Sequence, residues 1–209
     1  MDGNNRWSII NKVSKINAYK KGADKLFSLS NYLFSKYDIK YISAFALSHN
    51  NLKRNKNFKK IIFNLIDQYL DQFDNLKFEY KIKFIGDLSI FRQSTINKLQ
   101  RVESKNNHEK ILNIFINYSG RLDIIEALKK YKYGKINLNN FTNYLSTSYL
   151  PEPNIVYRSG GYSRISDFML YQISFSELFF SKKLWPDINQ ADLDKIIIKY
   201  KAIERKFGF

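Results

Sequence analysis

The amino-acid sequence predicts an α/β protein: a single layer of mainly parallel β-sheet flanked by helices, formed by a single domain over residues 1–209. The first observation is that apolar residues switch repeatedly between the spacing of a strand and that of a helix. The second is that no proline- or glycine-rich linker, repeat or low-complexity tract divides the chain. With 209 residues, 44% of them hydrophobic, the chain can enclose one full core.

The elements follow in order from these patterns. Short apolar or alternating segments predict strands at 40–47, 80–87, 111–118 and 153–159. Helical spacing predicts helices at 59–73, 120–131, 163–175 and 189–207. The opening MDGNNRW is expected to be strand-like and to lie on the same edge of the sheet as the ends of the other strands.

Polar segments follow three of the predicted strands. They are SHNNLKR after 40–47, SGR after 111–118 and RSGGYSR after 153–157. In open parallel sheets, ligands bind outside the carboxyl ends of the strands. The chemistry of the protein is therefore expected at this edge.

Composition narrows the classes of partner and site. Cysteine is absent, which excludes disulfides and thiolate metal sites. No apolar run is long enough to span a bilayer and no signal peptide opens the chain, so we expect a cytoplasmic protein. The formal net charge of +16 favours polyanionic partners such as nucleic acid, anionic lipids or phosphorylated small molecules. Drift of a low-GC genome toward lysine would give a similar charge, and this alternative stays open.

Several motifs follow one another along the chain. They are MDGNNRW (1–7), NYSGR (117–121), YRSGGYSRISDFMLYQISFSELFF (157–180), LWPD (184–187) and ERKFG (204–208). Together they resemble the cis-prenyltransferases over essentially the whole chain. The resemblance implies condensation of an allylic diphosphate, farnesyl diphosphate above all, with isopentenyl diphosphates. The implied product is a long-chain polyprenyl diphosphate, the undecaprenyl carrier of cell-wall glycans.

The chemistry of such a reaction suits the residues of the first motif. Magnesium on a diphosphate takes one or two carboxylate ligands, and Asp2 fits that role. Gly3 lets the backbone approach a phosphate, and Arg6 can grip one with two parallel hydrogen bonds. Without the downstream motifs, the heptapeptide would be interpreted as a disordered polar terminus.

The resemblance also assigns roles residue by residue. It implies that Asp2 and Asn51 are catalytic and that Asp2 and Glu177 bind Mg²⁺, with Asn51 near the proton that leaves isopentenyl diphosphate. His49, a tempting general base, occupies a variable position of the family. The substrate-binding residues implied are Gly3, Asn4, Asn5, Arg6, Trp7, Lys15, Tyr19, Ser48, His49, Asn50, Leu52, Arg54, Arg158, Arg164, Ile165 and Ser166.

The chain departs from the family pattern at several contacts. Lys15 and Tyr19 stand where the family usually has arginine and histidine, and Asn50 and Leu52 replace glutamate and tryptophan. Further departures are Ser119 for glycine, Tyr162 and Ser163 for an acidic residue and a histidine, and Asp167 for asparagine. Relatives also carry a strand before the MDGN motif, so either Met1 is not the true start or Asp2 is loosely held.

Helices expected at 20–37 and 59–75 would enclose an apolar product tunnel, whose bulky side chains would limit product length. Its candidate lining residues are Leu26, Leu33, Phe34, Ile62, Leu65, Ile66, Tyr69 and Phe73. The resemblance further implies a homodimer, and the basic surface suits peripheral contact with an anionic membrane.

Other functions remain open at this point. The changed contacts suit a weak or inactive partner subunit of a prenyltransferase, and the aromatic content suits a short-chain cis-prenyl diphosphate synthase. The charge alone would suit a nucleic-acid binder, but no recognition module supports that class, so nucleic acid is not an expected partner.

Overall fold

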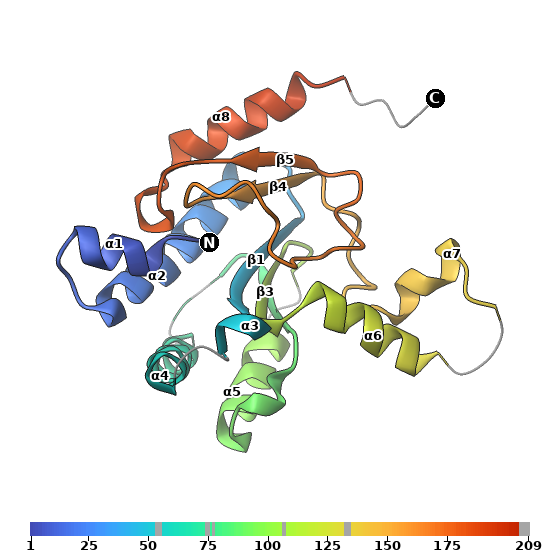
Figure 1. The fold of residues 1–209 in the computed structure, drawn as a ribbon, viewed down its shortest axis with the longest axis horizontal. Helices are drawn as coiled ribbons and strands as arrows, with labels where there is room; N and C mark the ends of the chain where they lie inside the picture. Colours follow the sequence, from blue (N-terminus) through green and yellow to red (C-terminus); the bar gives the residue numbers. More distant parts are fainter. Residues whose placement is uncertain (53–55, 74–75, 77, 106–107, 132–134, 205–209) are drawn as a thin grey trace. The chain divides into compact units, whose positions relative to one another are not determined.

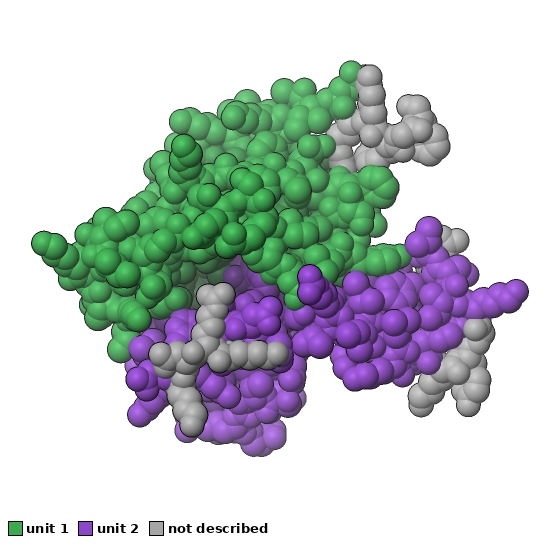
Figure 2. All heavy atoms as spheres, viewed as in Figure 1, with its two compact units in different colours: residues 1–32, 151–209 green, residues 33–150 purple. Residues whose placement is uncertain are grey.

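The structure is a computed structural model that describes residues 1–52, 56–73, 76, 78–105, 108–131 and 135–204. The chain divides into two compact units, residues 1–32 with 151–209 and residues 33–150 (Figure 2). Both contain parallel strands with helices, so the predicted α/β class is confirmed (Figure 1).

Residues 33–150 form a parallel sheet with helices. Its strands are β1 (Tyr41–Ser48), β2 (Lys81–Ile85) and β3 (Ile111–Tyr118), hydrogen-bonded in the order β1-β3-β2 within the described residues. The helical segments are α3 (His49–Leu52), α4 (Lys56–Gln72), η1 (Leu88–Ile90), α5 (Gln93–Ser104), α6 (Gly120–Lys130), α7 (Leu138–Phe141) and η2 (Thr142–Tyr144). Parallel neighbours need crossovers, which α4 and α5 supply.

The sequence of β3 suits its central position. ILNIFINY is buried along nearly its whole length, as a strand with neighbours on both edges requires. Its one asparagine in the middle, Asn113, accepts a hydrogen bond from the hydroxyl of Tyr149 at 2.5 Å. A short helix follows at once, because Ser119 caps α6 by accepting from the backbone of Leu122.

The carboxyl end of β2 requires a glycine. Gly86 has φ of +128°, and a Cβ there would meet the carbonyl oxygen of Ile116 on β3 at 2.0 Å.

We expect Gly86→Ala to lower the free energy of unfolding by about 3 kcal/mol, since backbone strain adds to overpacking. Chemical denaturation measures it. Gly161→Ala, with φ of +81° and no atom nearer than 3.9 Å, is the control and should lose far less. Equal losses in the two variants would contradict the role of the clash.

Residues 1–32 and 151–209 form the other unit. Its elements are α1 (Asn4–Ile10), most of α2 (Lys15–Lys36), β4 (Ile155–Arg158), β5 (Glu177–Phe180), η3 (Trp185–Asp187) and α8 (Gln190–Lys201). β4 and β5 pair in parallel, with Ile155 opposite Glu177 and Arg158 opposite Phe180. The indole of buried Trp185 donates to the carbonyl of Gly22 on α2 at 2.8 Å, which attaches η3 to that helix.

Two sequence predictions about this unit were wrong. The opening heptapeptide is not strand-like: Gly3, with φ of 107°, precedes α1. Residues 163–175 form turns instead of a helix, because Ser166, Asp167 and Met169 all have positive φ, which interrupts a right-handed helix. Their apolar spacing reflects burial of Met169 and Ile173 in a turn-rich segment.

Most other predicted elements lie close to their expected positions, and the helix expected at 20–37 is α2. The terminal helix α8 ends at Lys201, earlier than predicted, and α5 and β5 were not predicted. Most of the proposed tunnel residues are buried or half-buried. Phe34 stacks at an angle on Tyr80, whose ring centroid lies 4.8 Å away. Among the described helices, none has both the length and the apolar character of a membrane span.

Candidate active site

The carboxyl end of β4 is the centre of the candidate site. Arg158 is the last residue of the strand, and Ser159, Gly160 and Gly161 turn the chain away from it. Gly160 and Gly161 have φ of 92° and 81°, which glycine adopts without strain. Their backbone N–H groups donate to the carbonyls of Lys183 and Ser181 at 2.7 and 2.8 Å, so the turn is held in place.

Asp2 is fixed to this turn through its backbone. The hydroxyl of Ser159 lies 3.1 Å from both the N–H and the carbonyl oxygen of Asp2, accepting from one and donating to the other. The backbone N–H of Trp185 also donates to that carbonyl, at 2.9 Å. Ser159, directly after β4, and Trp185 of η3 therefore hold the backbone of Asp2 in place.

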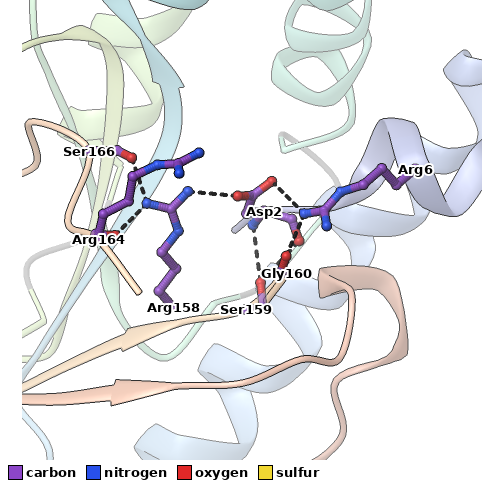
Figure 3. A network of polar contacts seen from close by, with 7 residues as sticks. All are labelled: Asp2, Arg6, Arg158, Ser159, Gly160, Arg164 and Ser166. Atoms are coloured by element: carbon purple, nitrogen blue, oxygen red, sulfur yellow. Dashed lines mark hydrogen bonds and ion pairs between the residues drawn. The ribbon is translucent and has the colours of Figure 1, made fainter. Parts of the chain in front are cut away.

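The Asp2 carboxylate lies between two guanidinium groups (Figure 3). Arg158 donates to its Oδ2 at 2.8 Å, and Arg6 on α1 approaches its Oδ1 at 3.4 Å. Burial alone would raise the pKa of Asp2, but the hydrogen bond and charge of Arg158 and the charge of Arg6 outweigh it and lower that pKa. Asp2 is thus a carboxylate at neutral pH, and its side chain remains 34% exposed.

The arginines are held by further contacts. Arg158 also donates to the hydroxyl of Ser166 at 2.5 Å and to the carbonyl of Arg164, and Arg6 donates to the carbonyl of Gly160 at 2.6 Å (Figure 3). Arg6 and Arg158 therefore contact one carboxylate, and Arg158 also contacts the backbone of Arg164. Such a cluster carries excess positive charge and suits a diphosphate.

The other residues of the first motif and of α2 have different surroundings. Trp7 is buried, and its indole donates to the Asp187 carboxylate at 2.7 Å, which joins α1 to η3. Asn4 packs against Gly22, where a Cβ would meet its Oδ1 at 2.3 Å. Asn5 and Lys15 are exposed, and Tyr19 is half-buried.

The predicted residues after β1 lie on α3, in the unit of residues 33–150. Ser48 ends β1 and accepts from the N–H of Asn51 at 3.2 Å, while His49, Asn50 and Leu52 complete the helix. The helix contacts β1 and β3, so it lies at the carboxyl end of that sheet, as predicted. Arg54 lies outside the described residues.

One histidine tautomer follows from this arrangement. The Asn117 amide donates through Nδ2 to the carbonyl of Asp87 at 2.8 Å, which leaves its Oδ1 facing His49. His49 Nδ1, 2.9 Å from that oxygen, then donates to it, and in the neutral ring this leaves Nε2 as an acceptor. Sequence motifs gave no signal for this pairing.

Glu177 lies at the other end of the β4–β5 pair. It is opposite Ile155, three residues before Arg158, or about 10 Å along the strand at ~3.3 Å per residue. Within the described residues no group of three or more His, Asp or Glu side chains could hold a metal ion. The register thus pairs Glu177 with Ile155 and not with Arg158, and its role as a metal ligand stays a prediction.

Sequence reasoning missed two contributors to the site. Ser159 fixes the backbone of Asp2, and Gly160 leaves room for it, since a Cβ there would meet Arg6 Nη2 at 2.8 Å and Asp2 Cγ at 3.0 Å. The Gly-Gly pair after a strand was the available signal, but it indicated only a turn.

The family model of the undecaprenyl diphosphate synthases matches residues 1–208. The chain belongs to this family of isoprenyl transferases. It is 35% identical to the tritrans,polycis-undecaprenyl-diphosphate synthase (geranylgeranyl-diphosphate specific) of Pyrobaculum aerophilum, covering 99% of this chain and 92% of that protein. It is also 35% identical to the ditrans,polycis-undecaprenyl-diphosphate synthase ((2E,6E)-farnesyl-diphosphate specific) of Buchnera aphidicola, covering 100% and 88%.

Solved structures agree with this membership. A probable undecaprenyl diphosphate synthase from Campylobacter jejuni superposes with a TM-score of 0.81 at 31% identity, covering 90% of this chain and 92% of that one. Lavandulyl diphosphate synthase from Lavandula x intermedia, in complex with dimethylallyl diphosphate, gives a TM-score of 0.88 at 24% identity, covering 100% and 95%, and shares the fold. The predicted family is confirmed.

Proposed function

We propose that this family member condenses an allylic diphosphate with successive isopentenyl diphosphates to make a long-chain polyprenyl diphosphate, the undecaprenyl carrier of cell-wall glycans. The observation that carries the proposal is the Asp2 carboxylate held between Arg158 and Arg6 at the end of β4. Relatives of equal identity differ in primer, one named for farnesyl and one for geranylgeranyl diphosphate. Farnesyl diphosphate is the proposed primer here.

The residues present fit Mg²⁺ as cofactor. Asp2 is ionised and partly exposed, and magnesium on phosphates commonly uses one or two protein carboxylates with substrate oxygens and water. Asp2 would hold the ion, whose charge would neutralise the departing diphosphate. The predicted role of Glu177 as a second ligand has no support from the register of β4 and β5.

The arginines and Asn51 on α3 have different proposed roles. Arg6 and Arg158 donate to diphosphate oxygens and offset the charge that develops as the carbon–oxygen bond breaks. Arg158, Arg164 and Ser166 form the proposed site for the isopentenyl diphosphate. Asn51 orients the carbon that loses its proton, and the amide leaves the proton to a stronger base such as the released diphosphate.

We propose that the protein forms a homodimer and that α6 lies in the interface. Leu122, Ile125 and Leu128 recur every three residues on this helix and are 38%, 46% and 48% exposed. An apolar stripe of this kind on a surface helix suits burial against a second copy. The net charge of +16 supports peripheral contact with anionic membranes. Without a recognition module, the same charge does not carry a proposal of nucleic-acid binding.

We expect Ile125→Asp to convert the dimer to a monomer, because a carboxylate would be buried in the apolar contact. Light scattering coupled to gel filtration measures the mass. Ile198→Asp, which introduces the same charge at the 65% exposed Ile198 of α8, is the control and should leave the mass unchanged. A dimer that persists in Ile125→Asp would exclude α6 from the interface.

Turnover of the purified chain tests the function. Farnesyl diphosphate, labelled isopentenyl diphosphate and Mg²⁺ should yield an extractable long-chain lipid, which should disappear when the metal is chelated. Geranylgeranyl diphosphate in place of the farnesyl primer tests primer choice, and chromatography gives the chain length. A chain that makes no product alone but does so with an active homologue would be a partner subunit.

A further inference from the structure

Tyr162 places one aromatic ring among the arginines of the site. The ring centroid lies 4.1 Å from the guanidinium carbon of Arg164, 4.9 Å from that of Arg6 and 5.7 Å from that of Arg158. These cations come from the loop after β4, from α1 and from β4 itself. A single side chain therefore contacts all three guanidinium groups, two of which also contact Asp2.

The local backbone explains how the ring reaches this position. Gly160 and Gly161 both have positive φ, and their N–H groups are tied to Lys183 and Ser181. The chain turns back immediately before Tyr162, so its side chain faces the end of the strand that it has just left. The residue is 41% exposed, which leaves part of the ring and its surroundings open to a ligand.

An aromatic ring and a carboxylate hold a guanidinium group in different ways. A guanidinium that stacks on a ring keeps its N–H groups directed outward, where they can donate to another acceptor. A carboxylate would accept those hydrogen bonds and cancel the charge. Asp2 is already a partner of Arg158 and Arg6, so a second carboxylate would leave the cluster with little net positive charge.

We propose that Tyr162 is a positioning residue that holds Arg6, Arg158 and Arg164 in a preformed arrangement for diphosphate binding, without itself accepting their hydrogen bonds or cancelling their charge. The identity of the ligand rests on the proposed function, but the role of the ring does not depend on turnover. Mutual repulsion of three cations is offset by their common contact with the ring face. Removing the ring lets Arg6 and Arg164 separate, and the ligand must then bring them together.

The test measures binding of inorganic pyrophosphate to the full chain by calorimetry, without turnover. Tyr162→Phe and Tyr162→Trp keep the ring and should bind within about twofold of the unsubstituted protein. Tyr162→Leu and Tyr162→Gln remove it and should bind about tenfold more weakly, as expected for the loss of two or three cation–π contacts. In an active enzyme, the KM for isopentenyl diphosphate should rise more than kcat falls.

Thermal unfolding of each variant separates this role from a structural one. Similar melting temperatures with weaker binding only in the ring-less variants support the proposal. Binding that is equal in all variants, or equally weak in Tyr162→Phe and Tyr162→Leu, overturns it. If the unsubstituted protein binds pyrophosphate in a ring-dependent way but makes no polyprenyl product, the positioning role stands and the proposed function fails. If the enzyme forms product but its KM is the same with and without the ring, the proposed function stands and the positioning role fails.

Discussion

Asp2→Asn is expected to lower kcat by about a thousandfold, the scale of losing a pre-organised charge from a reacting centre. The amide keeps the shape and the backbone contacts with Ser159 and Trp185, but it cannot supply the carboxylate proposed to hold Mg²⁺. Steady-state kinetics with farnesyl and isopentenyl diphosphates measure the change.

The same variant should bind inorganic pyrophosphate without metal at least as well as the unsubstituted protein. Removing the carboxylate frees Arg158 and Arg6 from an internal anion, so the site becomes more positive. Asp38→Asn, at an exposed position, is the control and should change neither quantity. A variant that turns over normally would remove Asp2 from the mechanism.

Gly160→Ala is expected to lower kcat/KM by about a hundredfold, since displacements of about 1 Å in a site cost that much. A methyl group there would lie 2.8 Å from Arg6 Nη2 and 3.0 Å from Asp2 Cβ and Cγ, so both side chains must move. Kinetics and far-UV circular dichroism together distinguish misplacement from unfolding.

Gly161→Ala provides a matched control for this substitution. Both glycines have positive φ, so both alanines carry a similar backbone strain. Only the first meets Asp2 and Arg6, because the nearest atom to a Cβ at Gly161 is Lys182 Cα at 3.9 Å. Comparable losses in the two variants would mean that backbone strain, and not contact with Asp2 and Arg6, controls activity.

Local sequence patterns predicted much of the fold. The short apolar run ILNIFINY favoured a buried strand, and it forms β3 between two neighbours. The periodic segments became α4, α6 and α8 within a few residues. The pattern failed at 163–175, where the same spacing of apolar residues occurs in turns, because positive φ at three positions is not visible in periodicity.

By itself, the sequence determined the α/β class and the family, and it placed the motif RSGGYSR at the end of a strand. Only the tertiary structure decided that Asp2 meets Arg158, 156 residues away, that Ser159 anchors it, and that Glu177 on β5 pairs with the first residue of β4. It also decided that Tyr162 contacts three arginines. The physical reason is the sequence separation over which each effect acts. Periodicity and turn chemistry act over a few residues, whereas these contacts arise when the backbone of one segment is hydrogen-bonded to a distant one.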